Sequence, residues 1–378
     1  MSVHDFTFPT GYHKFHRKSL YNFQFNRWHS LGFARYEDMV EAGKRINNFD
    51  QWKTVMTELA ERADTEERLL NAAIYYRGAE FYVREEDPDK HRLYEKFTSL
   101  FYGIFGDEII RDEVPYEGGA LPIIQIPAVG EQKGTIVMHG GFDSFIEEFY
   151  PKARYLSDHG YEVFAFEGPG QGGARRKFGL PITNDWEKPV GAVLDHLKLD
   201  DVTIYGISMG GYWCLRAAAF EPRIKRVVSS GGTWDYMRLM PGWANWLMRF
   251  FATHLRDYTN RKSYKAMEKS DRQAWMIWNL MYITRESTPM DAWEFMEMMN
   301  GVNQHAELIT QDVLLLVSKN DHFIPFKRHH LQIQALTAAR SVTEYIFEQD
   351  THADHHCQIG NIGLAMETII EWLDKQAY

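Results

Sequence analysis

Apolar side chains recur every three or four residues through much of the first 107 positions of the chain. Two stretches show this spacing clearly, residues 52–60 and residues 69–76. Such spacing gathers apolar side chains on one face of a helix. The pattern therefore predicts a mostly helical region over residues 1–107.

From residue 108 the pattern becomes that of β-strands. Residues 108–117 and 121–127 alternate around Glu117-Gly118-Gly119, which predicts a hairpin. Six short apolar runs separated by amphipathic stretches follow, at residues 134–138, 161–166, 202–205, 224–229, 313–317 and 342–347. Strands of this kind are buried on both faces. They predict an α/β core, with a mostly parallel sheet between helices, over residues 108–232 and 307–378.

One interruption separates the fourth apolar run from the fifth. Residues 233–306 have helical spacing, no strand pattern, and six of the 11 tryptophans and ten of the 16 methionines. Soft and aromatic side chains suit an apolar pocket, so we expect a helical cap that lines it together with the N-terminal helices. The substrate-binding candidates are Trp234, Trp243, Trp246 and Trp278. The alternative is a helical layer that is merely well packed.

The segment Gly206–Gly211 has the pattern Gly-x-Ser-x-Gly between an apolar strand and a run compatible with a helix. Such a turn is so sharp that its serine takes strained backbone geometry, and the glycines permit the close approach of neighbouring backbone. Ser208 is therefore the candidate nucleophile, at the carboxyl edge of the sheet.

A nucleophilic serine needs a base and a carboxylate that orients the base. In this fold the partners follow in the order Ser, Asp, His. Asp321 follows the strand at 313–317 and is the preferred acid. Asp235, after the preceding strand, is the competing candidate.

Three histidines, His352, His355 and His356, lie in the loop between the last strand and the closing helix. The base must reach back over the sheet edge to Ser208. We expect His356, because it ends the loop and the incoming helix holds its backbone in place.

The first of the apolar core strands ends in His139–Asp143, with the sequence His-Gly-Gly-Phe-Asp. A turn of this kind aims a backbone N–H at the carbonyl oxygen of a substrate, and the residue after the nucleophile supplies a second N–H. The expected oxyanion donors are Phe142 and Met209. His139 is expected to bond loop backbone. The glycine-rich loop 167–173 lacks phosphate-binding spacing and is expected to form a wall of the active site.

Composition excludes several classes of function. The chain of 378 residues carries 42 Lys and Arg against 52 Asp and Glu, a net charge of −10, so no basic surface for nucleic acid is expected. Cys214 and Cys357 are too few for a disulfide framework. Residues 1–15 lack the pattern of a signal peptide, and no apolar run approaches the roughly 20 residues that span a bilayer. We expect a soluble, cytoplasmic protein without membrane contacts.

With these motifs, the chain from about 108 to 378 resembles the α/β-hydrolase fold. Pro169–Gly172 and His356–Gln358 resemble the group that contains 2,6-dihydroxypseudooxynicotine hydrolase, fungal pigment polyketide-shortening hydrolases and FrsA-like esterases. The chain departs from that group at His355, where an acidic residue is expected. The resemblance implies hydrolysis of an ester or a ketone C–C bond of a small, apolar carbonyl compound through Ser208, without metal or cofactor, in a homodimer.

Three other readings are open at this stage. One is an activity like that of acylaminoacyl peptidases, although no β-propeller repeat precedes the core. A second is a metallohydrolase built on the cluster His352, Asp354, His355 and His356. A third is a binding protein that has kept the hydrolase fold without catalysis.

Overall fold

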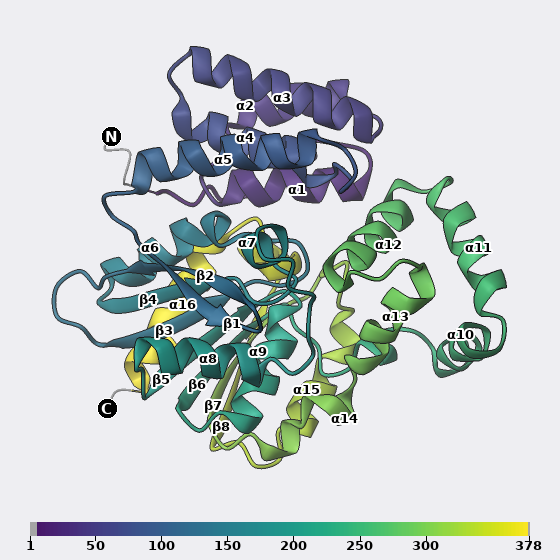
Figure 1. Ribbon diagram of the computed structural model, residues 1–378. Coiled ribbons are helices and arrows are strands. Elements are labelled where there is room, and N and C mark those ends of the chain that lie inside the picture. The colour runs from purple at the N-terminus through teal and green to yellow at the C-terminus, as the bar shows by residue number, and fades with distance from the viewer. Residues whose placement is uncertain (1–5, 377–378) are drawn as a thin grey trace.

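The computed structural model describes residues 6–376. An N-terminal region of helices stacks on one side of the sheet-containing core (Figure 1). Its helices are α1 (Ser19–Ser30), α2 (Tyr36–Arg45), α3 (Phe49–Thr65), α4 (Leu69–Phe81) and α5 (Asp89–Phe105). The two stretches with helical spacing fall inside α3 and α4, which confirms that prediction.

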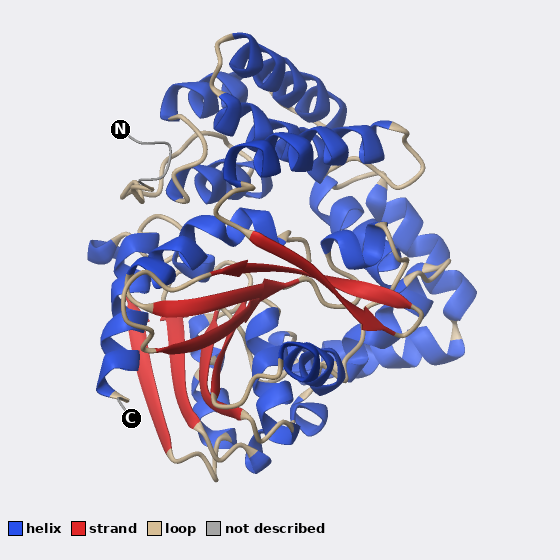
Figure 2. Cartoon of the chain, turned by 60° about the vertical axis from the view of Figure 1, so that its left-hand side comes forward, coloured by secondary structure: helices blue, strands red, loops and turns tan. Residues whose placement is uncertain are grey.

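The core is built on a twisted sheet of eight strands, in the order β1-β2-β4-β3-β5-β6-β7-β8 (Figure 2). The strands are β1 (Ile110–Tyr116), β2 (Gly119–Ile126), β3 (Gly134–His139), β4 (Tyr161–Phe166), β5 (Val202–Ile207), β6 (Ile224–Ser230), β7 (Asp312–Ser318) and β8 (Ser341–Phe347). Strands β3 to β8 pair in parallel, whereas β2 pairs antiparallel with both β1 and β4. The chain therefore has the predicted α/β-hydrolase fold, and each predicted strand boundary lies within two residues of the observed one.

Helices cover both faces of this sheet. They are α6 (Tyr150–Asp158), α7 (Gly172–Arg176), α8 (Glu187–Leu197), α9 (Gly210–Phe220), α15 (His330–Ala335) and α16 (Ile362–Lys375). Alternate strand residues point to opposite faces: Ile136 and Met138 join the buried cluster of α6, α16 and the N-terminal region, whereas Val137 joins that of α8 and α9. The two-sided burial explains why the strands read as continuous apolar runs.

The segment between β6 and β7 is helical, as expected, and lies beside the core (Figure 1). It contains the short turn η2 (Tyr236–Leu239), helices α10 (Gly242–His254), α11 (Arg256–Met267), α12 (Asp271–Thr284), α13 (Pro289–Met298) and α14 (Gly301–Gln304), and the turn η3 (Ala306–Leu308). We call α10 to α13 the cap. Further short turns are η1 (Ile146–Phe149), η4 (Phe326–Arg328), η5 (Gln349–Thr351) and η6 (His356–Gln358).

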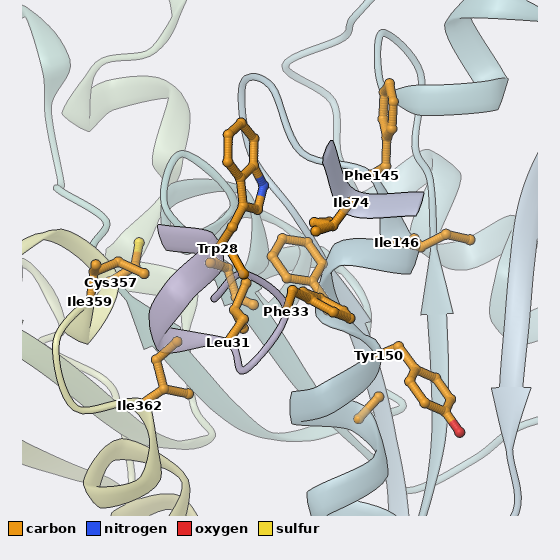
Figure 3. Packing of buried hydrophobic residues seen from close by; sticks show 14 of the residues in the cluster. Trp28, Leu31, Phe33, Ile74, Phe145, Ile146, Tyr150, Cys357, Ile359 and Ile362 are labelled. Carbon is orange, nitrogen blue, oxygen red and sulfur yellow. The ribbon is translucent and has the colours of Figure 1, made fainter. Parts of the chain in front are cut away.

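The N-terminal region packs on the core through side chains far apart in the sequence. Figure 3 shows Trp28 and Leu31 between Cys357 and Ile359 on one side and Phe33 and Ile74 on the other. The end of α1 is thereby brought to the loop that follows β8. In residues 6–376, no helix combines the length and the apolar character that crossing a bilayer requires.

Candidate active site

The turn after β5 has the geometry that its glycines predict. Ser208 takes a φ of 60°, in the left-handed region, and its N–H donates to the Ser230 carbonyl at 2.7 Å. A Cβ at Gly206 would collide with the backbone of Gly210, and one at Gly210 with the backbone of Gly140. Only glycine permits this approach. The strained turn projects Ser208 at the start of α9.

Three side chains from separate strand ends form one hydrogen-bonded chain. Ser208 Oγ lies 2.8 Å from His356 Nε2, and His356 Nδ1 lies 2.6 Å from Asp321 Oδ2. The other carboxylate oxygen of Asp321 accepts the N–H groups of Phe323 and Ile324 at 2.7 and 2.9 Å. Asp321 is thus held with one oxygen free for the imidazole, in the arrangement of nucleophile, base and orienting acid.

Burial and charge act in opposite directions on this pair. Burial alone would lower the pKa of His356, but the Asp321 carboxylate raises it well above 6.5. Burial would raise the pKa of Asp321, but His356 and the two backbone N–H donors bring it below its ordinary value. The pair therefore favours an imidazolium beside a carboxylate, which is the state formed once the base has taken a proton from serine.

The competing acid and bases lie elsewhere. Asp235 Oδ1 accepts the N–H groups of Met237 and Arg238 and so caps the turn η2. The ring of His355 stacks on Tyr12 at 3.5 Å between centroids, and its Nδ1 lies 3.1 Å from Asp354 Oδ1. Each side chain is committed to a local contact away from Ser208.

The remaining base candidate, His352, directly follows η5 and has a φ of 59°. The four residues His352, Asp354, His355 and His356 do not converge: within residues 6–376, no three His, Cys, Asp or Glu side chains are placed to share a metal ion. Tertiary structure separates them because His356 turns to Ser208 while His355 turns to Tyr12.

The predicted oxyanion donors lie beside the nucleophile. Phe142 and Met209 both line the cavity that contains Ser208. In the described part of the chain, neither backbone N–H donates to a protein acceptor. Both donors are therefore available to a substrate oxygen. His139 behaves as expected, with Nδ1 3.0 Å from the Gly140 carbonyl oxygen.

The glycine-rich loop after β4 braces the oxyanion turn. Gln171 Nε2 donates to the carbonyls of Gly140 and Gly141 at 2.9 and 3.0 Å. Holding these carbonyls toward Gln171 fixes the peptide planes that precede Phe142. None of residues 167–173 lines the cavity that contains Ser208, so the loop supports the oxyanion turn from behind and does not form the expected wall of the site.

A buried glutamine anchors the loop that carries His356. Gln358 Oε1 accepts from Ser230 Oγ at 2.7 Å, and its Nε2 donates to Ser318 Oγ at 3.1 Å. These serines are the last residues of the neighbouring strands β6 and β7. Asn320 adds a second tie, because its N–H donates to the Asp354 carbonyl at 2.8 Å. The motif His-Cys-Gln therefore positions the base through its glutamine.

The cavity beside Ser208 has a volume of about 400 Å³ and is mostly apolar. Its walls come from three parts of the chain. The core contributes Ser208, His356 and the residues around them, and α1 and its end contribute Phe23, Arg27 and Leu31. The cap side contributes Met237, Met240, Trp275, Met276, Trp293 and Met296, among others. The size suits a small organic ligand. Sequence reasoning missed the α1 residues, since no motif marks them.

The four tryptophans expected to bind substrate do not line this cavity, and that prediction was wrong. Trp243 and Trp246 are 72% and 66% exposed on α10. Trp234 packs against Gly301, and Trp278 packs on Phe49 with centroids 5.0 Å apart. Residue type does not reveal which face of a cap helix turns inward. Two other tryptophans, Trp275 and Trp293, are the ones that line the cavity.

The parallel sheet, the strained serine turn and the three hydrogen-bonded side chains define an α/β hydrolase. Residues 130–355, more than half of the chain, match the family model described as serine aminopeptidase, S33. The chain belongs to this family of α/β hydrolases.

Curated relatives are similar over different lengths. The alpha/beta hydrolase psoB of Aspergillus fumigatus is 27% identical over 96% of this chain and 94% of its own. The 2,6-dihydropseudooxynicotine hydrolase of Paenarthrobacter nicotinovorans is 30% identical over 54% of this chain and 61% of its own. A crystal structure of 2,6-dihydroxy-pseudo-oxynicotine hydrolase, 22% identical, superposes with a TM-score of 0.65 over 92% of this chain and 94% of that one. The relationship to this group of hydrolases agrees with the motifs in the sequence.

Proposed function

We propose that the chain is a serine hydrolase that cleaves an ester or a ketone C–C bond in a small or mid-sized, largely apolar carbonyl compound. One observation carries the proposal: the chain Ser208–His356–Asp321, at 2.8 and 2.6 Å, opens into an apolar cavity of about 400 Å³. A nucleophile paired with an oriented base in a cavity of ligand size is the arrangement that acyl transfer requires.

In the proposed reaction, His356 accepts the proton of Ser208 as Oγ attacks the substrate carbonyl carbon. The carbonyl oxygen becomes an oxyanion that the N–H groups of Phe142 and Met209 stabilise. Collapse of this intermediate expels an alkoxide or an enolate carbon, which takes the proton from His356. Water, deprotonated by His356, then attacks the acyl-serine, and the acid product leaves as Ser208 regains its proton.

The apolar lining supports a small carbonyl substrate over a peptide. Among residues 6–376, Asp143 is the only carboxylate that lines the cavity, and Arg27 already pairs with it at 3.2 Å. A free carboxylate that could bind a peptide amino terminus is therefore lacking among the described lining residues. The intact hydrogen-bonded chain likewise supports catalysis over simple binding. The Paenarthrobacter relative bears the name of a small-molecule substrate.

Labelling with a fluorophosphonate tests the proposal. The wild-type protein should be modified once, on Ser208, at a rate unaffected by a chelator, and Ser208→Ala should not be modified. The His356→Ala protein should label at a rate close to background, whereas His355→Ala should label normally. Modification elsewhere, or none in the folded wild-type protein, would refute the assignment. Aryl esters and β-diketones assayed beside the Ser208→Ala blank then separate ester from C–C cleavage.

A further inference from the structure

A buried lysine shares the cavity with Ser208 and has no place in the reaction described above. Lys152 lies in α6, is 3% exposed, and lines the same cavity as the nucleophile. Helix α6 follows the oxyanion turn through η1, so the lysine belongs to the fixed core and not to the cap.

Lys152 lacks the carboxylate partner that other buried cations of this protein have. Arg77 pairs with Glu80 at 2.5 Å and with Glu148 at 3.1 Å, and Lys90 pairs with Glu80 at 2.7 Å. For Lys152, no carboxylate of residues 6–376 lies within 4.0 Å of its ammonium group, and no hydrogen-bond acceptor is in reach. A buried ammonium without a partner is costly, so it is seldom retained for packing alone.

The charges around Lys152 favour an anion. Burial lowers the pKa of Lys152 to about 8; the nearby Arg27 adds to this lowering, and the nearby Cys357 acts against it. The amine therefore still carries a proton at neutral pH. Arg27 is already neutralised by Asp143 and Glu148.

The cap side adds one more cation and no counter-ion. Arg272 lines the cavity and stacks over Phe323 at 5.8 Å, without a carboxylate partner among the described residues. The net charge of the side chains that line the cavity is therefore positive, although most of the lining is apolar. An apolar molecule with one anionic oxygen would complement it.

We propose that Lys152 is a specificity-determining residue that binds an anionic oxygen of the substrate, either a carboxylate or the enolate of an acidic 1,3-dicarbonyl group. The inference rests on the proposed function, because it assigns a substrate class to the Ser208 centre. The bound anion would supply the missing partner of a buried ammonium, and a charge-assisted hydrogen bond in such a place is a strong one.

A matched pair of esters tests the proposal. Mono-p-nitrophenyl glutarate carries a carboxylate, and p-nitrophenyl hexanoate has a neutral chain of similar length. The ratio of kcat/KM for the anionic over the neutral ester should fall by about tenfold or more in Lys152→Met, and Lys152→Arg should restore part of it. The control is Lys188→Met, an exposed lysine paired with Asp185, which should leave the ratio unchanged. An unchanged ratio in Lys152→Met would overturn the proposal.

A binding experiment separates this inference from the proposed reaction. In the Ser208→Ala protein, quenching of tryptophan fluorescence should report tighter binding of benzoate than of benzamide, and of ionised dimedone than of 3,3-dimethylcyclohexanone. The two pairs distinguish carboxylate from enolate. Both preferences should vanish in Ser208→Ala/Lys152→Met. If neither ester turns over but the preference is present, the reaction is wrong and the anion site stands. If Lys152→Met does not fold, equal binding of each pair to Ser208→Ala overturns the proposal.

Discussion

The N-terminal helices and the cap are both helical and both rich in aromatic residues, yet they are built differently. In α1, ten of 12 residues are buried, whereas in α10 only Ala252 is buried. The N-terminal region joins the buried cluster of one sheet face, with Trp28, Trp52 and Tyr75 fully enclosed. Aromatic content by itself therefore does not indicate burial.

The ion pairs of the two regions differ in the same way, being buried in the N-terminal region and exposed in the cap. Arg27 and Arg77 from the N-terminal helices meet the fully buried Glu148 of η1 at 2.9 and 3.1 Å. Burial would raise the pKa of Glu148, but the two guanidinium groups hold it below its ordinary value. The comparable contacts of the cap, such as Arg256 with Glu294 at 2.8 Å, lie at the surface. Buried contacts therefore attach the N-terminal region to the core, whereas the ion pairs of the cap are mostly exposed to solvent.

The largest expected effect comes from breaking the buried contact. Glu148→Ala removes the buried carboxylate that Arg27 and Arg77 share and leaves Asp143 and Glu80 as their remaining partners. Because this breaks a buried ion pair, the free energy of unfolding should fall by about 3–5 kcal/mol. The matched change in the cap, Arg256→Ala, should cost no more than about 1 kcal/mol because that pair is solvent-screened. Urea unfolding measures both. Equal losses would show that the two regions are attached alike.

A pair of tryptophan substitutions should give a contrast nearly as large. Trp28→Ala opens a cavity in the core and removes the bond from Nε1 to Glu148 at 2.8 Å, for a cost of about 3–5 kcal/mol. Trp246→Ala, on the exposed face of α10, should cost less than about 0.5 kcal/mol. Thermal unfolding of the two variants is the measurement. A large loss in Trp246→Ala would mean that α10 is covered in solution.

For substrate binding the cap should matter more than it does for stability. Trp275 lines the cavity and meets Phe142 edge-on at 5.6 Å. Trp275→Ala should raise KM for an apolar aryl ester by about tenfold, through lost apolar contact. Trp243→Ala is the matched control, since that side chain is at the surface. Similar kinetics in the two variants would contradict the assigned walls.

A smaller effect is expected where the two regions touch. Asp271, at the start of α12, accepts from Tyr21 Oη at 2.9 Å and pairs with Lys18. Because the ion pair is partly exposed, Asp271→Asn should cost about 1 kcal/mol or less. Proteolysis within the cap should become faster if this contact holds α12 against α1. An unchanged rate of proteolysis would show that other contacts keep α12 against α1.

The smallest effect of a cap substitution should be on the pH dependence of catalysis, because the groups that set it, His356 and Asp321, lie in the core. On p-nitrophenyl hexanoate, kcat/KM should rise with pH and reach half its maximum above pH 6.5, because His356 must lose its proton to act as a base and Asp321 raises its pKa. The profile of Trp275→Ala should have the same midpoint, whereas Asp321→Asn should shift it to lower pH. If Trp275→Ala moved the midpoint, the pH dependence would not be set by the core alone.

The sequence by itself determined the features that depend on local constraints. Burial on both faces makes each strand a short apolar run, and a serine at positive φ needs glycines around it, so the strands and Ser208 could be identified from neighbouring residues. The order of motifs after successive strands also indicated Asp321 and His356, because carboxyl ends of parallel strands meet at one edge.

Only the tertiary structure decided which side chains enclose the cavity. Its wall joins Phe23 of α1, Lys152 of α6 and Trp275 of α12, which lie more than 100 residues apart along the chain. Their approach depends on how whole helices pack, and the rotation of a helix about its axis decides whether a tryptophan faces inward, as Trp275 does, or outward, as Trp246 does. Neither property is encoded in residue type or in local spacing.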